Sequence, residues 1–273
     1  MEFLYLLNFF VFGTIIGSFL NVVINRFNTG RSINGRSFCP NCGQKLNWYD
    51  LIPILSWIFL RGKCRNCHSK ISPQYPLVEF STAVLFTLIY LNFSFLFLAK
   101  PLIFYIFYFW IAVILAILLV IFVYDFKHKI IPDLLSYTFA GMGLIQTLIL
   151  IPYISGSGTI LFYLDLSAGL IFFIPFFLLW FVSGGRWIGL GDGKLVLGIG
   201  WFLGFTYGLN AIVLAFWTGA IFSLVLLLIV KLKKGSKHIT MKSEIPFGPF
   251  LILATILEFF IRIDFLGISF FLK

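Results

Sequence analysis

The chain has few acidic residues and few histidines. Its 273 residues include 10 Asp and Glu against 20 Lys and Arg, and only 3 His. His68, His128 and His238 all lie in polar segments between apolar runs. No Ser-His-Asp or H-E-x-x-H arrangement is present, so the parts of a serine protease or a zinc protease are missing.

Other signals are missing as well. The net charge of +10 could indicate nucleic-acid binding, but the basic residues sit in loops, without a basic surface that carries aromatic or base-reading groups. There is no internal repeat. The first apolar run follows Glu2 directly and lacks the basic flank and small-residue cleavage site of a signal peptide, so we expect it to be kept as a first span.

What the chain has in abundance is apolar sequence. Hydrophobic residues make up 60% of it, charged residues only 11%, and 36 residues are Phe. The mean hydropathy is +1.03. This composition excludes an ordinary soluble domain and predicts an all-α polytopic membrane protein.

A spanning helix needs about 20 mostly apolar residues. Eight runs meet this test, and the sixth and seventh are separated only by the short uncharged turn 204–210. Lys and Arg are enriched in short cytoplasmic loops. Seventeen of the 20 basic residues fall on alternate loops, so we expect eight spans with both termini outside. The runs are 3–25, 76–99, 101–124, 134–153, 159–182, 193–208, 209–230 and 247–266.

All four cysteines lie in the one sizeable polar segment, loop 26–75, in two C-x-x-C pairs. Paired knuckles at this separation are typical of a structural four-thiolate zinc site, and thiols stay reduced in a cytoplasmic loop. The apolar stretch 50–60 between the pairs is too short to span and should lie on the membrane surface. We expect His68 to be a bystander. The predicted ligands are Cys39, Cys42, Cys64 and Cys67.

One lone aspartate ends a long apolar run, and another lone aspartate begins a later one. Asp125 ends the third predicted span and Asp192 begins the sixth, so both should lie at the cytoplasmic edge. Two carboxylates in contact share a proton and can act as an acid–base pair. Gly189, Gly191 and Gly193 would let a peptide backbone approach Asp192.

The alternative is that each aspartate only neutralises a nearby cation, and the residues alone leave both interpretations open. Lys194 is poorly placed to pair with Asp192, because it is about 200° away around a helix.

The remaining acids have structural interpretations. We expect Asp133 and Glu79 to stabilise helix starts, and Glu258 to pair with Arg262 four residues on. We assign no chemistry to Asp165 or Asp264.

The motifs together resemble a known family over nearly the full length. It is the bacterial type IV prepilin leader peptidases, which also act as N-methyltransferases. The resemblance rests on the segment 17–26, the paired knuckles, the flanking segments 46–53 and 60–65, the segment 75–79, Asp125 with 131–133, the G-x-G-D motif with Lys194-Leu195, and the segment 245–250. Asn25 and Phe27 depart from the residues that the family often has.

The resemblance implies that Asp125 and Asp192 are catalytic. It also implies removal of short basic leaders from prepilin-like or pseudopilin precursors at the cytoplasmic face of the bacterial inner membrane. Residues 99–273 would form a six-span peptidase core. Residues 1–98, with two spans and the cysteine loop, would be associated with methylation of the new N-terminus by S-adenosylmethionine. No G-x-G-x-x-G follows a strand, so the residues that bind this donor are not predicted.

Three rival interpretations remain open. A presenilin-like or signal-peptide-peptidase-like protease shares the aspartate motifs, but it lacks the cysteine loop and has a Pro-Ala-Leu motif that is absent here. An acid-pair ion transporter would place its acids near the bilayer midplane, usually with internal repeats. An inactive zinc-ribbon scaffold would tolerate loss of either aspartate.

Overall fold

The computed structural model describes residues 2–29, 32, 34–155, 160–232 and 245–267. The chain divides into two compact units, an N-terminal unit of residues 1–120 and a C-terminal unit of residues 121–273. All regular structure in the described part is helical, apart from two isolated bridges in the cysteine loop. This confirms the predicted all-α class. The elements are α1 (Glu2–Arg26), η1 (Trp48–Leu51), α2 (Leu55–Phe59), α3 (Gln74–Ala99), α4 (Pro101–His128), α5 (Asp133–Ser155), α6 (Ile160–Ser183), α7 (Leu190–Leu232) and α8 (Gly248–Ile261).

Five helices of the described part are long and apolar enough to cross a membrane: α1, α3, α4, α6 and α7. The predicted runs 193–208 and 209–230 both fall within α7, and the predicted eighth span contains only the 14 residues of α8. The predicted fourth run lies in α5, which is not among the five. The count of eight spans therefore stays a prediction.

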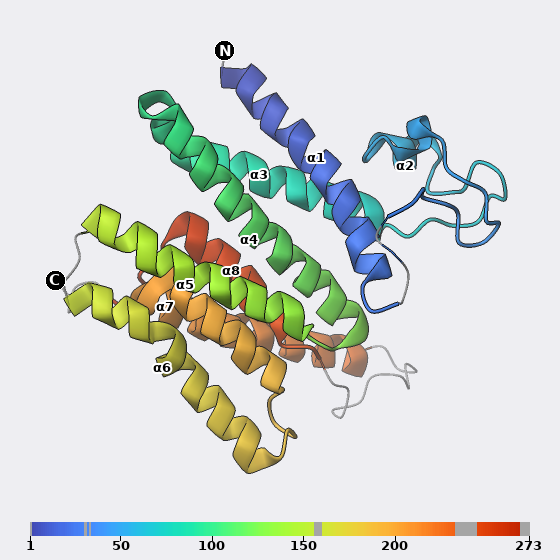
Figure 1. Ribbon diagram of the computed structural model, residues 1–273. Helices are drawn as coiled ribbons and strands as arrows, with labels where there is room; N and C mark the ends of the chain where they lie inside the picture. The colour runs from blue at the N-terminus through green and yellow to red at the C-terminus, as the bar shows by residue number, and fades with distance from the viewer. Residues whose placement is uncertain (1, 30–31, 33, 156–159, 233–244, 268–273) are drawn as a thin grey trace. The chain divides into compact units, whose positions relative to one another are not determined.

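In the N-terminal unit, α1 and α3 pack side by side (Figure 1). Their backbones approach closely because a Cβ at Gly13 would lie 2.5 Å from Ala83 Cα, and one at Gly17 would lie 2.6 Å from Glu79 Cα. Small residues permit such contacts between apolar helices. The Asn21 amide adds a 3.0 Å hydrogen bond to the Tyr75 carbonyl, which fixes the ends of the two helices next to the cysteine loop.

Aromatic rings fill the rest of this unit. Phe9 of α1 stacks on Tyr90 of α3 at 4.8 Å between ring centroids. Phe9 also contacts Tyr108 of α4 at 4.8 Å, and Phe104 contacts Tyr90 edge-on at 6.2 Å. Such pairs add stability beyond the area that they bury. Residues 101–120 of α4 thus belong to the same packed cluster as α1 and α3.

In the C-terminal unit, α7 contacts α5, α6 and α8 and is the central element (Figure 1). Glycines again set the spacing: a Cβ at Gly200 would lie 2.7 Å from Gly169 of α6, and one at Gly198 would lie 2.5 Å from the Phe139 ring of α5. Because α7 is packed against three neighbours, its first turn, which contains Asp192, is held in a fixed position.

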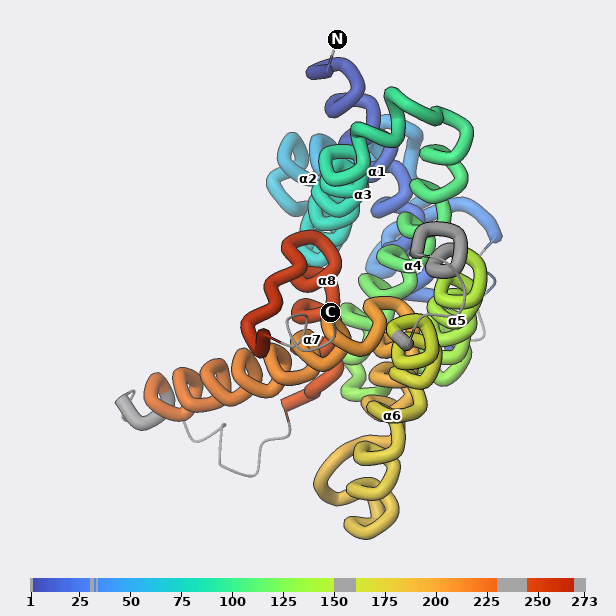
Figure 2. The backbone as a smooth tube through the Cα atoms, turned by 90° about the vertical axis from the view of Figure 1, so that its left-hand side faces the viewer, coloured from blue at the N-terminus to red at the C-terminus, as the bar shows by residue number. Residues whose placement is uncertain are grey.

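The long helix α7 is broken at Gly204, where φ is 77° and ψ is −177°. Only glycine adopts this conformation readily. In Figure 2 the tube after the break runs in a different direction from the tube before it. The Asp165 carboxylate of α6 accepts a 2.8 Å hydrogen bond from the Phe205 N–H, which the break leaves without a helical partner. The predicted turn 204–210 is therefore a one-residue break that a neighbouring helix caps.

We predict that Gly204→Ala lowers the free energy of unfolding by about 1–3 kcal/mol. The conformation disfavours any side chain, and the new Cβ would lie 2.5 Å from Asp165 Oδ1. Thermal unfolding in detergent would measure the change. Gly141→Ala is the matched control: no atom lies within 4 Å of its added Cβ, and the residue is helical, so its stability should stay the same or rise slightly. Equal unfolding temperatures for the two variants would contradict the prediction.

Candidate active site and metal centre

Asp125 and Asp192 both lie in the C-terminal unit, at ends of two different helices. Asp125 is in the last turn of α4, and Asp192 is in the first turn of α7. Asp125 is only 4% exposed, whereas Asp192 is half-buried. The two carboxyl groups are near enough for the charge of Asp125 to act on Asp192. The fold thus brings together two acids that are 67 positions apart in the sequence.

Backbone N–H groups hold both carboxyl groups. Asp125 accepts a hydrogen bond from the N–H of Gly248, the first residue of α8. A Cβ at Gly248 would lie 2.5 Å from Asp125 Oδ2, so only glycine fits there. Asp192 accepts from the N–H of Gly189, directly before its own helix. An acid at this position is stabilised by the helix N-terminus, which gives Asp192 a structural role as well.

Neither aspartate belongs to an ion pair recorded for the described part of the chain. Lys194 pairs instead with Asp133, with 2.7 Å between Nζ and Oδ1, and lies 5.1 Å from the Tyr137 ring centroid. The sequence correctly predicted that Lys194 does not neutralise Asp192. Asp133 begins α5 as predicted, and its pairing with Lys194 also ties α5 to α7.

Ile131 lies against two glycines of the site, Gly191 and Gly248. A Cβ at Gly191 would lie 3.0 Å from Ile131 Cβ, and one at Gly248 would lie 3.1 Å from Ile131 Cδ1. Ile131 therefore fits between the starts of α7 and α8. A Cβ at Gly193 would lie 3.5 Å from the Phe173 and Phe176 side chains of α6, which is an ordinary contact distance. The tighter contact at Gly191 gives that residue a packing role that the sequence did not reveal, and the approach of a peptide backbone stays a prediction.

The four cysteines form one cluster in the N-terminal unit. Each offers one sulfur, and the four sulfurs lie within 4.8 Å of one another. The Cys39 and Cys67 sulfurs are 3.8 Å apart. Four sulfurs about 2.3 Å from a tetrahedral zinc ion would be about 3.8 Å from one another. All four thiols are free of disulfides, so this donor set fits a zinc ion.

Two turns of the same construction carry the cysteines. The Cys39 N–H donates to the Gln44 carbonyl, and the Cys64 N–H donates to the Ser69 carbonyl, each at 2.9 Å. An antiparallel bridge closes each turn, Phe38 with Lys45 and Lys63 with Lys70. Hydrogen bonds, the largest contribution coming from the Ser69 hydroxyl, lower the pKa of the Cys67 thiol to about 5, which favours the thiolate that a metal ion requires.

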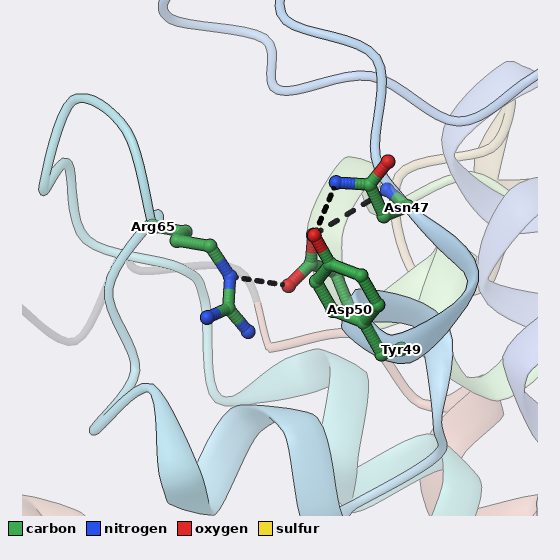
Figure 3. A network of polar contacts seen from close by, with 4 residues as sticks. All are labelled: Asn47, Tyr49, Asp50 and Arg65. Atoms are coloured by element: carbon green, nitrogen blue, oxygen red, sulfur yellow. Dashed lines mark hydrogen bonds and ion pairs between the residues drawn. The ribbon is translucent and has the colours of Figure 1, made fainter.

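The segment between the knuckles is ordered by a small polar network (Figure 3). Asp50 accepts a 2.9 Å ion-paired hydrogen bond from Arg65 Nε and a 3.4 Å hydrogen bond from the Asn47 N–H. The Asn47 amide donates to the Tyr49 hydroxyl at 2.7 Å, and the Arg65 guanidinium lies 4.9 Å from the Tyr49 ring centroid. The network joins the first helical turn of this segment to the second knuckle.

Ile54 has an unusual backbone, with φ 61° and ψ −54°. A β-branched residue rarely adopts a positive φ, and the strain is on the order of 1–3 kcal/mol. Its N–H donates a 2.7 Å hydrogen bond to Glu79 Oε2. The sequence predicts that Glu79 stabilises the start of its own helix. Its carboxylate instead accepts hydrogen bonds from the Ile54 N–H of the cysteine loop and from the Ser18 hydroxyl of α1, long-range contacts that a local pattern does not reveal.

Two further acids differ from the sequence prediction. Glu258 and Arg262 do not form the predicted ion pair: Arg262 lies over the Tyr207 ring, and Glu258 is 2% exposed with Oε2 lacking a hydrogen-bond partner. Arg262 is the left-handed residue that ends α8, so its side chain leaves the helical direction. Asp165, to which we assigned no chemistry, caps the break in α7.

Comparison with known protein families supports the resemblance seen in the sequence. The family model described as "Bacterial Peptidase A24 N-terminal domain" matches residues 11–93, and the one described as "Type IV leader peptidase family" matches residues 112–224. No solved structure matches the chain.

Several curated proteins are similar to it, and the three described next are named "Prepilin leader peptidase/N-methyltransferase". The one from Myxococcus xanthus is 36% identical over 80% of this chain and 62% of its own length. The one from Vibrio cholerae is 38% identical over 50% of this chain and 54% of its own length. The one from Pectobacterium carotovorum is 31% identical over 88% of each protein. The matched region is thus less than two thirds of the first two relatives and most of the third. On these matches, the chain belongs to the type IV leader peptidase family.

Proposed function

We propose that the chain is a membrane-embedded aspartic endopeptidase that removes the short basic leader from type IV prepilin-like precursors. One observation carries the proposal. Two carboxyl groups from separate helices lie near one another, and neither takes part in a recorded ion pair of the described residues. Two neighbouring carboxyl groups without a neutralising cation are costly in an apolar molecule, and such pairs occur mainly at functional sites.

The two carboxyl groups differ in environment, which suits an acid–base pair. Because Asp125 is buried, Asp192 is half-buried and the two are close together, the pair is more stable with one proton between the carboxyl groups than with two negative charges. The ionised carboxylate takes a proton from water, and the water oxygen attacks the scissile carbonyl carbon. The protonated carboxyl group gives its proton to the carbonyl oxygen. When the C–N bond breaks, the carboxyl group that holds the water proton passes it to the leaving amine. The other carboxylate takes a proton back from a hydroxyl of the tetrahedral intermediate, so the product is a carboxylic acid and the pair again holds one proton.

The location follows from the apolar helices and the charge pattern. We propose a multi-pass protein of the bacterial inner membrane, with eight spans, both termini outside and the aspartates at the cytoplasmic face. The alternation of basic loops supports this orientation. A precursor with a basic leader and an apolar helix would bring its cleavage site to the same membrane edge. The partners are therefore prepilin or pseudopilin precursors and the bilayer, and no nucleic acid is involved.

We further propose that residues 1–98 support N-methylation of the new N-terminus, with S-adenosylmethionine as donor, and that residues 99–273 form the peptidase core. The relatives' names combine the two activities. When bound, the donor supplies an electrophilic methyl group to the amine. The four cysteines would hold a structural zinc ion that keeps the loop folded.

We predict that Asp125→Asn and Asp192→Asn each reduce precursor cleavage about a thousandfold or more, because an amide cannot exchange protons as a carboxyl group does. Cleavage of a prepilin-like precursor in membranes, followed by mass spectrometry, measures the effect. Asp264→Asn is the isosteric control, because the amide oxygen can still accept the Asn210 hydrogen bond. Cleavage at nearly the wild-type rate by Asp125→Asn or by Asp192→Asn would contradict the two-aspartate mechanism.

We predict that Cys39→Ser releases zinc, because a hydroxyl is a poor zinc ligand and three thiolates leave the site incomplete. The zinc content of the purified protein, measured by elemental analysis, should fall from about one zinc per chain in the wild type to well below one in the variant. A variant that keeps one zinc per chain would argue against the four-thiolate site.

The pH at which zinc is released gives a separate test. Ser69→Ala removes the hydrogen bond that lowers the pKa of the Cys67 thiol, so the pKa of this thiol rises. Protons then compete with zinc at higher pH. During acidification, the variant should lose zinc at a pH about half a unit to one unit above the wild type. Ser72→Ala is the control in the same loop, because it also removes a serine hydroxyl, one that accepts a hydrogen bond from the Gln74 N–H. Identical release curves for Ser69→Ala and wild type would contradict the assignment.

A further inference from the structure

A cavity of about 790 Å³ lies within the N-terminal unit, between the cysteine loop and the adjoining ends of α1 and α3. Its volume is in the range of sites for small molecules and cofactors. Residues from all three segments form its wall. Those that matter most for recognition are Tyr49, Asp50, Trp57, Tyr75 and Glu79.

The two carboxylates of this wall differ in charge balance. The Asp50 carboxylate is neutralised by Arg65 at 2.9 Å. Glu79 is only 7% exposed, and in the described part of the chain its hydrogen-bond partners, the Ile54 N–H and the Ser18 hydroxyl, are both neutral. A carboxylate buried without a cation is costly, so a positively charged ligand would be stabilised next to it.

The backbone at Ile54 supports the same conclusion. The left-handed φ of this β-branched residue directs its N–H to one oxygen of Glu79. Sparsely populated conformations of this kind persist where the surroundings hold them, often at ligand sites. The hydrogen bond occupies Oε2 and fixes the orientation of the carboxyl group in the cavity wall.

Aromatic rings make up another part of the wall. Tyr49, Trp57 and Tyr75 all line the cavity, and Trp57 is held by a 3.3 Å hydrogen bond from Nε1 to the Ile71 carbonyl. Ring faces can stack on a purine base and attract a cation. Lys45 and Lys70 line the cavity as well and provide positive charge for a carboxylate. Acid, aromatic and basic groups thus match a ligand with a sulfonium, a nucleobase and an amino-acid end.

We propose that this cavity binds the methyl donor S-adenosylmethionine, with Glu79 as counter-ion of the sulfonium and the aromatic residues against the adenine. The inference rests on the proposed methyltransferase activity and adds the site to it. It gives the cysteine loop a further role, because the zinc-held loop forms one wall of the donor site.

The test compares two ligands that differ in one charge. S-adenosylhomocysteine has the same nucleoside and amino-acid groups, but a neutral thioether replaces the sulfonium. Titration calorimetry with the zinc-loaded, full-length protein in detergent should show that the wild type binds S-adenosylmethionine more tightly. Glu79→Gln should weaken that binding about tenfold or more and change binding of S-adenosylhomocysteine about threefold or less. Glu2→Gln, an exposed position outside the cavity, is the matched control and should behave as wild type.

A measurement that needs no substitution supplements the titration. Ultraviolet cross-linking of radiolabelled S-adenosylmethionine to the wild type, followed by peptide mapping, should place the label within residues 46–79. Label within residues 121–273, or an unchanged preference for the sulfonium in a folded Glu79→Gln variant, would overturn the site.

The outcomes also separate this inference from the proposed function. A wild-type protein that cleaves precursor but binds neither nucleoside would refute the donor site and leave the peptidase assignment intact. A protein that binds S-adenosylmethionine at this cavity but does not cleave precursor would support the site and refute the peptidase. Tighter binding of adenosine monophosphate than of S-adenosylmethionine would show an anion site and overturn the proposal.

Discussion

The C-terminal unit depends on the placement of two carboxyl groups in an almost entirely apolar environment. Asp125 is 4% exposed and receives an N–H from Gly248, while Asp192 receives one from Gly189. Backbone donors stabilise a carboxyl group without fixing its charge as an ion pair with Lys or Arg would. The lysine closest in sequence to Asp192, Lys194, is engaged by Asp133. Neither carboxyl group of the pair is therefore held ionised by a recorded ion pair of the described residues.

Close backbone contacts make this placement possible. The end of α4 can approach the start of α8 because Gly248 has no side chain, and Ile131 fits against Gly191 for the same reason. Within the same unit, Gly198 and Gly200 set α7 against α5 and α6. In a membrane, helices associate through close packing of this kind more than through burial of apolar surface. The glycines near Asp192 therefore position the acid before they have any role toward a substrate.

The sequence predicted features that depend on composition and short spacing. The apolar runs predicted an all-helical chain, and the two C-x-x-C pairs predicted a cluster that the structure confirms in Cys39, Cys42, Cys64 and Cys67. The prediction that Lys194 is poorly placed to neutralise Asp192 is also confirmed, because Lys194 pairs with Asp133.

Contacts between distant segments could not be predicted in this way. Nothing near Glu79 in the sequence indicates a hydrogen bond to Ile54, and nothing near Asp165 indicates that it caps the break at Gly204. For Glu258 and Arg262 the sequence predicted an ion pair that the described residues do not form. A spacing of four residues suggests a pair on one helix face, but Arg262 ends the helix in a left-handed conformation and contacts Tyr207.

If Asp125 and Asp192 work as one proton-sharing unit, the pH dependence of kcat/KM for precursor cleavage should reveal it. A pair that needs one proton should give a bell-shaped profile, because activity falls both when the pair binds a second proton and when it loses its only one. We expect this bell-shaped profile for the wild type. A rate that rises through a single ionisation and then stays level would contradict it.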